Sequence, residues 1–259
     1  MIRMRTDIFA ESLGMGTSLT VLMPQAAAGI GMGGDDAAPA HGDGVPVLYL
    51  LHGLSDDCTI WERRTSIERY ASEKGIAVVM PQVGRSFYCD EALGEAYWTY
   101  LSEELPQLLA RTFRISTARE DTFVAGLSMG GFGAFKLALN HPERFAAAAS
   151  LSGVVDLVAL EDLDVHQGHL AERIWGGKRP DGTQDDLVGL LRAADPASLP
   201  ALFLDCGTED PLVMLNRGFI AAAEETGVAM QSRLRPGNHT WDFWDTSIQD
   251  VLDWLPIRA

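Results

Sequence analysis

The stretch DTFVAGLSMGGFGAFKLALN, from Asp121 to Asn140, places a strand, a sharp turn and a helix directly after one another. Its first part, DTFVAG, is almost wholly apolar, which is typical of a strand buried on both faces of a parallel sheet. Its last part, SMGGFGAFKLALN, has the spacing of a helix and ends before Pro142. Glycines flank Ser128 at the junction, where side chains would clash as the backbone turns from strand into helix. The stretch therefore predicts a strand, turn and helix with a serine at the turn.

Other short apolar runs resemble this strand, and segments with helical spacing separate them. The runs are VPVLYLL (45–51), GIAVVMP (75–81), FAAAASLSG (145–153) and ALFLDCG (201–207). The helical patterns lie at 59–74, 97–113, 211–226 and 245–255. Strands that alternate with helices predict an α/β fold, a mostly parallel sheet with helices on both faces. Near the N-terminus, TSLTVLMP (17–24) alternates and is predicted to be a strand at an antiparallel edge.

The composition allows one large α/β domain. With 259 residues, 47% of them hydrophobic, the chain can bury a full core. We see no internal repeat and no linker that would divide the sheet, so residues 1–259 are expected to form a single domain. The Ala-, Gly- and Asp-rich segment near 25–45 has no periodicity and is predicted to be a flexible insert between two strands.

Charge and cysteine usage limit the partners. The formal net charge is −16, from 36 acidic and 20 basic residues, which argues against nucleic acids and anionic membranes as partners. Three widely separated cysteines give neither a disulfide framework nor a zinc-site spacing, and we expect reduced thiols. No run reaches the roughly 18 apolar residues of a membrane span, and no signal-peptide core is present at the N-terminus. We expect a cytoplasmic protein that acts on small neutral or apolar molecules. Exposed edge strands would also allow a homo-oligomer.

The position of Ser128 favours a nucleophile. Ligands of open α/β sheets bind beyond the carboxyl ends of the strands, and Ser128 follows such an end. The residues from Gly126 to Gly130 match the G-x-S-x-G nucleophile elbow. The helix that follows adds free N–H groups and a positive dipole end beside the serine. The alternative is a serine that only caps the helix, but a place between a buried strand and a helix favours the nucleophile.

A nucleophilic serine needs a histidine base later in the chain. His239, in PGNHTWDFWD, follows the strand-like AMQSRLRP and precedes the final helix, and a loop base on a rigid sheet suits the role. His166 and His169, in DVHQGH, could bind a metal, but no third ligand converges on them in the sequence. We therefore predict His239 as the base; the alternative is a loop histidine packed among the neighbouring tryptophans.

An acid is expected to orient this base, and five carboxylates are candidates. Asp205 falls within the strand ALFLDCG, and Glu209 precedes the better-placed Asp210 in the turn that follows. Asp242 and Asp245 are nearer the histidine in sequence but follow no strand end. We predict Asp210, which would hold the imidazole in one tautomer and stabilise its protonated form. Because Asp210 stands just before a predicted helix, a helix cap is the alternative.

The reaction would pass through a tetrahedral oxyanion that needs preorganised N–H donors. One donor is expected from Met129, the residue after the nucleophile. The second should come from HGLSDD (52–57), after the strand VLYLL, and we predict the N–H of Leu54. Gly53 would let this loop pass close to the substrate, although a plain turn glycine would look the same.

Five segments together resemble the esterase D group of α/β hydrolases, and within it the bacterial tributyrin-esterase-like carboxylesterases. They are YLLHGLSDDCTIWERRTSIERYASEKGIAVVMPQVGRSFYCD (49–90), YWTYLSEELPQLL (97–109), FVAGLSMGGFGAFKLAL (123–139), LFLDCGTEDPLV (202–213) and PGNHTWDFW (236–244). The resemblance covers nearly the whole chain from about residue 5 and implies an eight-stranded sheet, short-chain acyl esters as substrates and no cofactor. It implies the same triad, Ser128, Asp210 and His239, and the same oxyanion donors, Leu54 and Met129.

The acyl pocket is less well defined by the sequence. The resemblance implies a variable, cap-like segment near 155–200. Trp61, Tyr88, Trp98 and Trp175 are predicted to line the pocket, although such aromatic residues more often belong to the core. Relatives in the group hydrolyse S-formylglutathione, feruloyl or acetyl groups on polysaccharides, or simple acyl esters, and some related folds transfer the acyl group to a sugar.

The sequence therefore predicts a serine carboxylesterase that works through an acyl-enzyme. An S-formylglutathione hydrolase is the enzymatic alternative, because a thioesterase would use every catalytic residue named above. A catalytically silent hydrolase fold that serves in binding is the alternative from another class; it is disfavoured because all three triad members are present.

Overall fold

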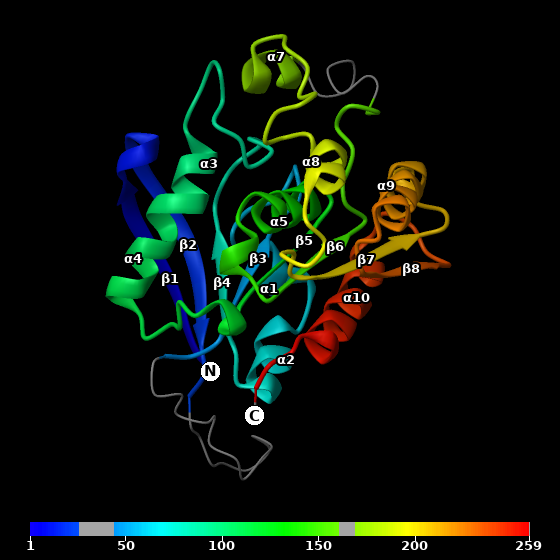
Figure 1. Cartoon of the computed structure of the whole chain (residues 1–259). Coiled ribbons are helices and arrows are strands. Elements are labelled where there is room, and N and C mark those ends of the chain that lie inside the picture. Colours follow the sequence, from blue (N-terminus) through cyan, green and yellow to red (C-terminus); the bar gives the residue numbers. More distant parts are fainter. Residues whose placement is uncertain (26–43, 161–168, 259) are drawn as a thin grey trace.

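A computed structural model describes residues 1–25, 44–160 and 169–258 of the chain. Its centre is one eight-stranded sheet with the strand order β1-β2-β4-β3-β5-β6-β7-β8 (Figure 1). The strands are β1 (Ile2–Ala10), β2 (Met15–Met23), β3 (Val47–Leu51), β4 (Ala77–Pro81), β5 (Thr122–Leu127), β6 (Ala147–Leu151), β7 (Ala201–Gly207) and β8 (Met230–Arg235). From β4 to β8 all neighbours pair in parallel, whereas β2 runs antiparallel to β1 and to β4. The predicted α/β fold is confirmed.

The strand β1 was missed by the sequence analysis. Its sequence IRMRTDIFA carries charged residues because it lies at the edge of the sheet, where alternate side chains are exposed. The predicted strand at 17–24 is confirmed as β2, including its antiparallel pairing, but β1 lies outside it and forms the edge. The central strands β3 to β6 are buried along their whole length, as their apolar sequences predicted.

Helices cover both faces of this sheet, as expected for parallel strands with crossover connections. The α-helices are α1 (Ile60–Arg64), α2 (Ile67–Lys74), α3 (Tyr97–Thr99), α4 (Leu105–Thr112), α5 (Met129–Asn140), α7 (Leu170–Trp175), α8 (Leu187–Ala193), α9 (Val213–Thr226) and α10 (Trp241–Trp254). Short 3-10 turns lie at η1 (Glu11–Leu13), η3 (Arg119–Asp121) and η4 (Pro142–Arg144). Apolar side chains of α4, α5, α8 and α9 form the core on one face, and those of α1, α2 and α10 form the core on the other.

The helical predictions are confirmed with local differences. The pattern at 59–74 forms two helices, and the last helix begins at Trp241, four residues before the predicted start. The pattern at 97–113 contains a π-helical turn, η2 (Tyr100–Glu104). The π-helical turn arises because Pro106, two residues after its end, has no N–H to donate to the carbonyl of Ser102. Arg144 donates to that carbonyl instead.

Parts of the sequence prediction fall outside the described residues. Nearly all of the insert predicted near 25–45 lies there, as does His166. The cap-like segment near 155–200 is described in part, by α7 and α8. All three cysteines lie in the described residues, and each is a free, buried thiol. None of the described helices is both long and apolar enough to cross a membrane.

Candidate active site

The turn at Ser128 has the strained backbone of a nucleophile elbow. The strand β5 ends at Leu127, α5 begins at Met129, and Ser128 between them has φ of 53° and ψ of −116°. This left-handed conformation is uncommon for a residue with a side chain, and it turns the half-buried serine outward at the carboxyl end of the strand. A Cβ atom on Gly126 would collide with the backbone of Gly130. Only glycine therefore fits there.

Backbone hydrogen bonds hold this strained turn in place. The N–H of Ser128 donates to the carbonyl of Leu151 on β6, at 2.9 Å. The carbonyl of Ser128 accepts from the N–H groups of Phe132 and Val154, each at 3.2 Å. Local strain persists only where the surroundings over-determine it, and these bonds to two elements do so. The position of the serine is thus fixed by the sheet and by α5 together.

His239 and Asp210 meet across the loops that follow β8 and β7. Their Nδ1 and Oδ2 atoms are 2.8 Å apart. The Asp210 side chain is fully buried, and its other oxygen accepts the N–H of Leu212 at 2.8 Å. Burial acts to raise the pKa of Asp210, but the hydrogen bonds from His239 and from the Leu212 N–H outweigh it and lower this pKa. The carboxylate is therefore held in its charged form beside the imidazole.

Three of the four other candidate acids lie in different surroundings. Asp205 is fully buried and accepts hydrogen bonds from Arg233, Arg235 and Ser247. Asp245 accepts the Tyr70 hydroxyl, and Asp242 is exposed at the start of α10.

Glu209 has a structural contact that the sequence analysis did not foresee. Its carboxylate accepts the N–H of Gly237, and its own N–H donates to the Gly237 carbonyl at 3.0 Å. This reciprocal pair ties the loop of Asp210 to the loop of His239. The sequence gives no clear sign of this contact, because it joins two loops that meet only in the fold.

Ser128 and His239 line the same cavity, at the carboxyl ends of the parallel strands. The cavity has a volume of about 460 Å³. Its wall is formed by Gly53, Leu54, Ser55, Asp56, Arg85, Leu127, Ser128, His239, Trp241 and Trp244. Both residues are described, and no hydrogen bond joins the serine hydroxyl to the imidazole; such contacts commonly tighten when substrate binds. The arrangement is suited to attack by a serine on a carbonyl carbon inside the cavity.

The two predicted oxyanion donors have N–H groups available. Within the described parts of the chain, neither the N–H of Leu54 nor that of Met129 donates a hydrogen bond to protein. Leu54 lines the cavity, and Met129 directly follows the cavity-lining Ser128. Gly53 is more than a plain turn glycine, because a Cβ atom there would lie 2.8 Å from both Asp56 and Leu127. The close packing holds the loop against Leu127, the residue before the nucleophile.

The four aromatic residues predicted to line the pocket do not line this cavity. Trp61, Tyr88 and Trp98 are buried in the core, and Trp175 is half-buried with its indole N–H bonded to Asp185. Trp61, Tyr88 and Trp98 therefore fit the core alternative, with Trp61 packed behind the cavity-lining Trp241, and Trp175 is partly buried beside Asp185.

Two other tryptophans form the aromatic wall. Trp241 and Trp244, at the start of α10, pack edge-to-face with ring centroids 5.3 Å apart. Trp244 also packs edge-to-face against the ring of His239, with ring centroids 4.8 Å apart. Their position next to the predicted base in PGNHTWDFW was the available signal.

Within residues 1–25, 44–160 and 169–258, no three His, Cys, Asp or Glu side chains are arranged to hold a metal ion. His169, one of the two histidines considered for such a site, is exposed and pairs with Glu172.

The comparison with known families decides the assignment. A model of the family described as "Putative esterase" matches residues 37–255. The chain belongs to this esterase family. The acetyl esterase of Caldicellulosiruptor saccharolyticus is 27% identical to this chain over 223 residues, which cover 82% of this chain and 84% of the acetyl esterase. The diacylglycerol acyltransferase/mycolyltransferase Ag85A of Mycobacterium leprae is 30% identical over 251 residues, which cover 80% and 73% of the two chains.

Solved structures agree with this assignment. FphF, a fluorophosphonate-binding serine hydrolase of Staphylococcus aureus, is 33% identical, with a TM-score of 0.87 over 100% of the esterase and 99% of FphF. The S-formylglutathione hydrolase FrmB of the same organism is 34% identical, with a TM-score of 0.82 over 98% of each chain. The esterase is thus a carboxylesterase of the α/β serine-hydrolase type, consistent with the esterase D group.

Proposed function

We propose that Ser128, His239 and Asp210 form a catalytic triad that hydrolyses short-chain acyl esters, such as tributyrin, through an acyl-enzyme. The observation that carries the proposal is the 2.8 Å contact between His239 and Asp210 on the wall of the cavity that also holds the strained Ser128. A charged Asp210 keeps Nδ1 of the imidazole protonated, so that Nε2 is free to act as a base.

The reaction then follows from this arrangement. The Ser128 hydroxyl attacks the ester carbonyl while His239 accepts its proton, and the resulting oxyanion is bound by the N–H groups of Leu54 and Met129. The tetrahedral intermediate collapses, the carbon–oxygen bond to the alcohol breaks, and His239 returns the proton to the departing alcohol. A water molecule then gives a proton to His239 and attacks the acyl carbon. When the second intermediate collapses, the bond between the acyl carbon and the serine oxygen breaks, the carboxylic acid leaves, and His239 returns the proton to Ser128.

A short acyl group suits the size and wall of the cavity. The volume of about 460 Å³ is small for a ligand site, and Leu54, Leu127, Trp241 and Trp244 give it an apolar surface. A second candidate, hydrolysis of S-formylglutathione, is supported by the 34% identity to FrmB. Thioesters and oxyesters would use the same triad, so the two activities differ only in how the cavity binds the leaving group.

An assay with both substrate classes tests the proposal. Rates for p-nitrophenyl esters from acetate to dodecanoate are compared with rates for feruloyl esters and S-formylglutathione. We expect kcat/KM to be highest for short acyl oxyesters. A preference for S-formylglutathione would transfer the proposal to the second candidate, and no turnover of any of these substrates would overturn it.

We further infer that residues 1–259 form one domain in which the segment 155–200 acts as a cap. The support is that apolar side chains of α7 and α8 join the same core as α5. Limited proteolysis should then yield no separately stable fragment.

Three free, buried thiols support a cytoplasmic location.

A further inference from the structure

The orientation of the Leu54 N–H depends on the carbonyl of Gly53. Both groups belong to one trans peptide unit, so they point in opposite directions. The Gly53 carbonyl accepts Nδ1–H of His52 at 2.7 Å and the N–H of Asp56 at 3.2 Å. With its carbonyl held on this side, the peptide directs the Leu54 N–H to the other.

His52 is itself held on both sides. Its Nε2 accepts the N–H of Val83 at 3.2 Å, which fixes the tautomer that carries a proton on Nδ1. Burial lowers the pKa of His52 to about 4, so the ring is neutral at neutral pH. The backbone carbonyl of His52 accepts the hydroxyl of Tyr88, at 2.9 Å. Tyr88 therefore anchors the first peptide of the loop that carries the proposed oxyanion donor.

Tyr88 stands in a strained and fully buried turn. Phe87 and Tyr88 have φ of 51° and 55°, a left-handed conformation that is unfavourable for large side chains. The Tyr88 ring lies on α5 at Gly133, where a Cβ atom would fall within 3.0 Å of three ring carbons. The N–H of Tyr88 donates to the hydroxyl of the buried Ser86, at 3.1 Å. The turn thus reaches from the nucleophile helix to the oxyanion loop.

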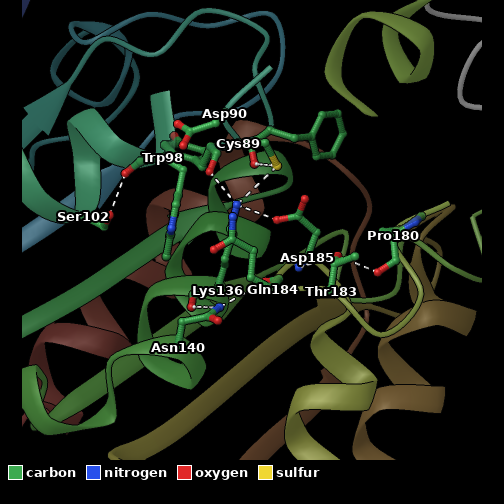
Figure 2. A network of polar contacts seen from close by, with 12 residues as sticks. Cys89, Asp90, Trp98, Ser102, Lys136, Asn140, Pro180, Thr183, Gln184 and Asp185 are labelled. Carbon is green, nitrogen blue, oxygen red and sulfur yellow. Dashed lines mark hydrogen bonds and ion pairs between the residues drawn. The ribbon is translucent and has the colours of Figure 1, made fainter. Parts of the chain in front are cut away.

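A buried lysine on α5 holds the turn from the other side. Lys136 is fully buried, and its Nζ donates to the carbonyl of Tyr88 at 2.9 Å. The same Nζ lies 2.6 Å from Oδ1 of Asp185, near the sulfur of Cys89, and 4.2 Å from the centroid of the Trp98 ring. Figure 2 shows the amine between Asp185 and Cys89, beside Trp98. One charged group thereby joins α5, the strained turn and the segment before α8.

We propose that Tyr88 is a positioning residue for the oxyanion hole, held in its strained turn by Lys136. Its hydroxyl holds the carbonyl of the peptide between His52 and Gly53. The next peptide, between Gly53 and Leu54, is thereby kept in the orientation that presents the Leu54 N–H to the cavity. The inference rests on the proposed function of the site. It differs from the sequence prediction for Tyr88, which placed this side chain on the pocket wall.

The variant Tyr88→Phe removes only the hydroxyl. Loss of a complete oxyanion donor lowers kcat by roughly 10² to 10³. Loss of a bond that supports the donor is expected to lower kcat by about tenfold, with KM within about twofold of wild type. The active enzyme is counted by titration with a fluorophosphonate, so that partial unfolding cannot imitate the effect.

Tyr100→Phe is the matched control. The Tyr100 hydroxyl is also buried but has no hydrogen-bond partner among the described residues, so its removal is expected to leave kcat unchanged. A trifluoromethyl ketone, which forms an oxyanion with the serine, should bind Tyr88→Phe about tenfold more weakly. The non-fluorinated ketone should bind both variants as it binds the wild type.

Each outcome has a defined meaning. A lower kcat and weaker binding of the fluorinated ketone in Tyr88→Phe alone support the proposal. Equal kcat in Tyr88→Phe and Tyr100→Phe, with an active wild type, overturns the proposal and leaves the triad intact. An inactive wild type overturns both. If Tyr88→Phe is unfolded at the assay temperature, Ser86→Ala tests the same turn, and an unchanged kcat there also overturns the proposal.

Discussion

Nδ1 of His239 lies 2.8 Å from Oδ2 of Asp210, although the two residues are 29 positions apart in the chain. They come from the loops after β8 and β7, two parallel strands that are direct neighbours in the sheet. The pair between Glu209 and Gly237 ties these loops together a few residues away. The geometry of the proposed base is therefore a property of the sheet edge and is not left to a mobile loop.

Asp210→Asn is expected to lower kcat by roughly 10³ to 10⁴. The amide would occupy the same space, but it can donate to Nδ1 and so favour the tautomer that leaves Nε2 protonated. Steady-state kinetics with p-nitrophenyl butyrate would measure the effect. Asp242→Asn is the matched control, since this acid is exposed three residues from His239, and its kcat should stay within about twofold of wild type. Equal losses in the two variants would contradict the assignment.

Trp241→Ala is expected to shift the preference of the enzyme toward longer acyl chains. The indole forms part of the cavity wall and packs against Trp61 behind it, with ring centroids 5.2 Å apart. Its removal enlarges the cavity, so kcat/KM for p-nitrophenyl octanoate should rise several-fold relative to acetate. Trp254→Phe, at a partly buried position that packs against the core at the other end of α10, should leave this ratio unchanged. An unaltered ratio in Trp241→Ala would place the acyl group elsewhere.

His52 is expected to make the fold sensitive to acid. Burial lowers its pKa from the ordinary 6.5 to about 4, so the unfolded chain takes up a proton before the folded protein does. Its contribution to stability is therefore complete above pH 6.5, is lost as the pH falls, and is gone below about 4. A difference of this size corresponds to about 3 kcal/mol.

Urea unfolding at several pH values would measure this contribution. His52→Asn has no group that titrates in this range at the same position. The difference in free energy of unfolding between wild type and His52→Asn should fall steadily from pH 6.5 to pH 4. A difference that is independent of pH would show that His52 is not kept neutral by burial.

Lys136 and Asp185 are expected to be strongly coupled in stability. Removal of one partner leaves the other charge buried and unpaired, which costs about 3 to 5 kcal/mol in either Lys136→Met or Asp185→Asn. The double variant removes both charges and keeps an acceptor for the indole N–H of Trp175. It should therefore be less destabilised than the sum of the single variants by about 2 kcal/mol in chemical denaturation. Additive effects would argue against the ion pair.

Local sequence patterns were sufficient for much of the fold and for the candidate triad. Buried parallel strands are continuous apolar runs, and an elbow serine needs glycines on both sides, so both features can be recognised within a few residues. Asp210 and His239 could be predicted because the ends of neighbouring parallel strands meet at one edge of the sheet.

Features that depend on contacts between distant segments could not be predicted in this way. Tyr88 looks like any pocket aromatic in the sequence, and only the fold brings its hydroxyl to the carbonyl of His52. The strand β1 was missed because an exposed edge strand carries charged side chains. The contact of Glu209 could not be predicted either, because its partner Gly237 lies in another loop that only the fold brings close.

The most direct test of the central claim is the reaction of Ser128 itself. Wild type and Ser128→Ala are assayed with a short-chain p-nitrophenyl ester, and both are treated with a fluorophosphonate before peptide mapping by mass spectrometry. The triad predicts a single label on Ser128 of the wild type, no label on the variant, and a loss of kcat of at least about 10⁴ in the variant. Hydrolysis that persists in Ser128→Ala, or a label on another serine, would contradict Ser128 as the nucleophile.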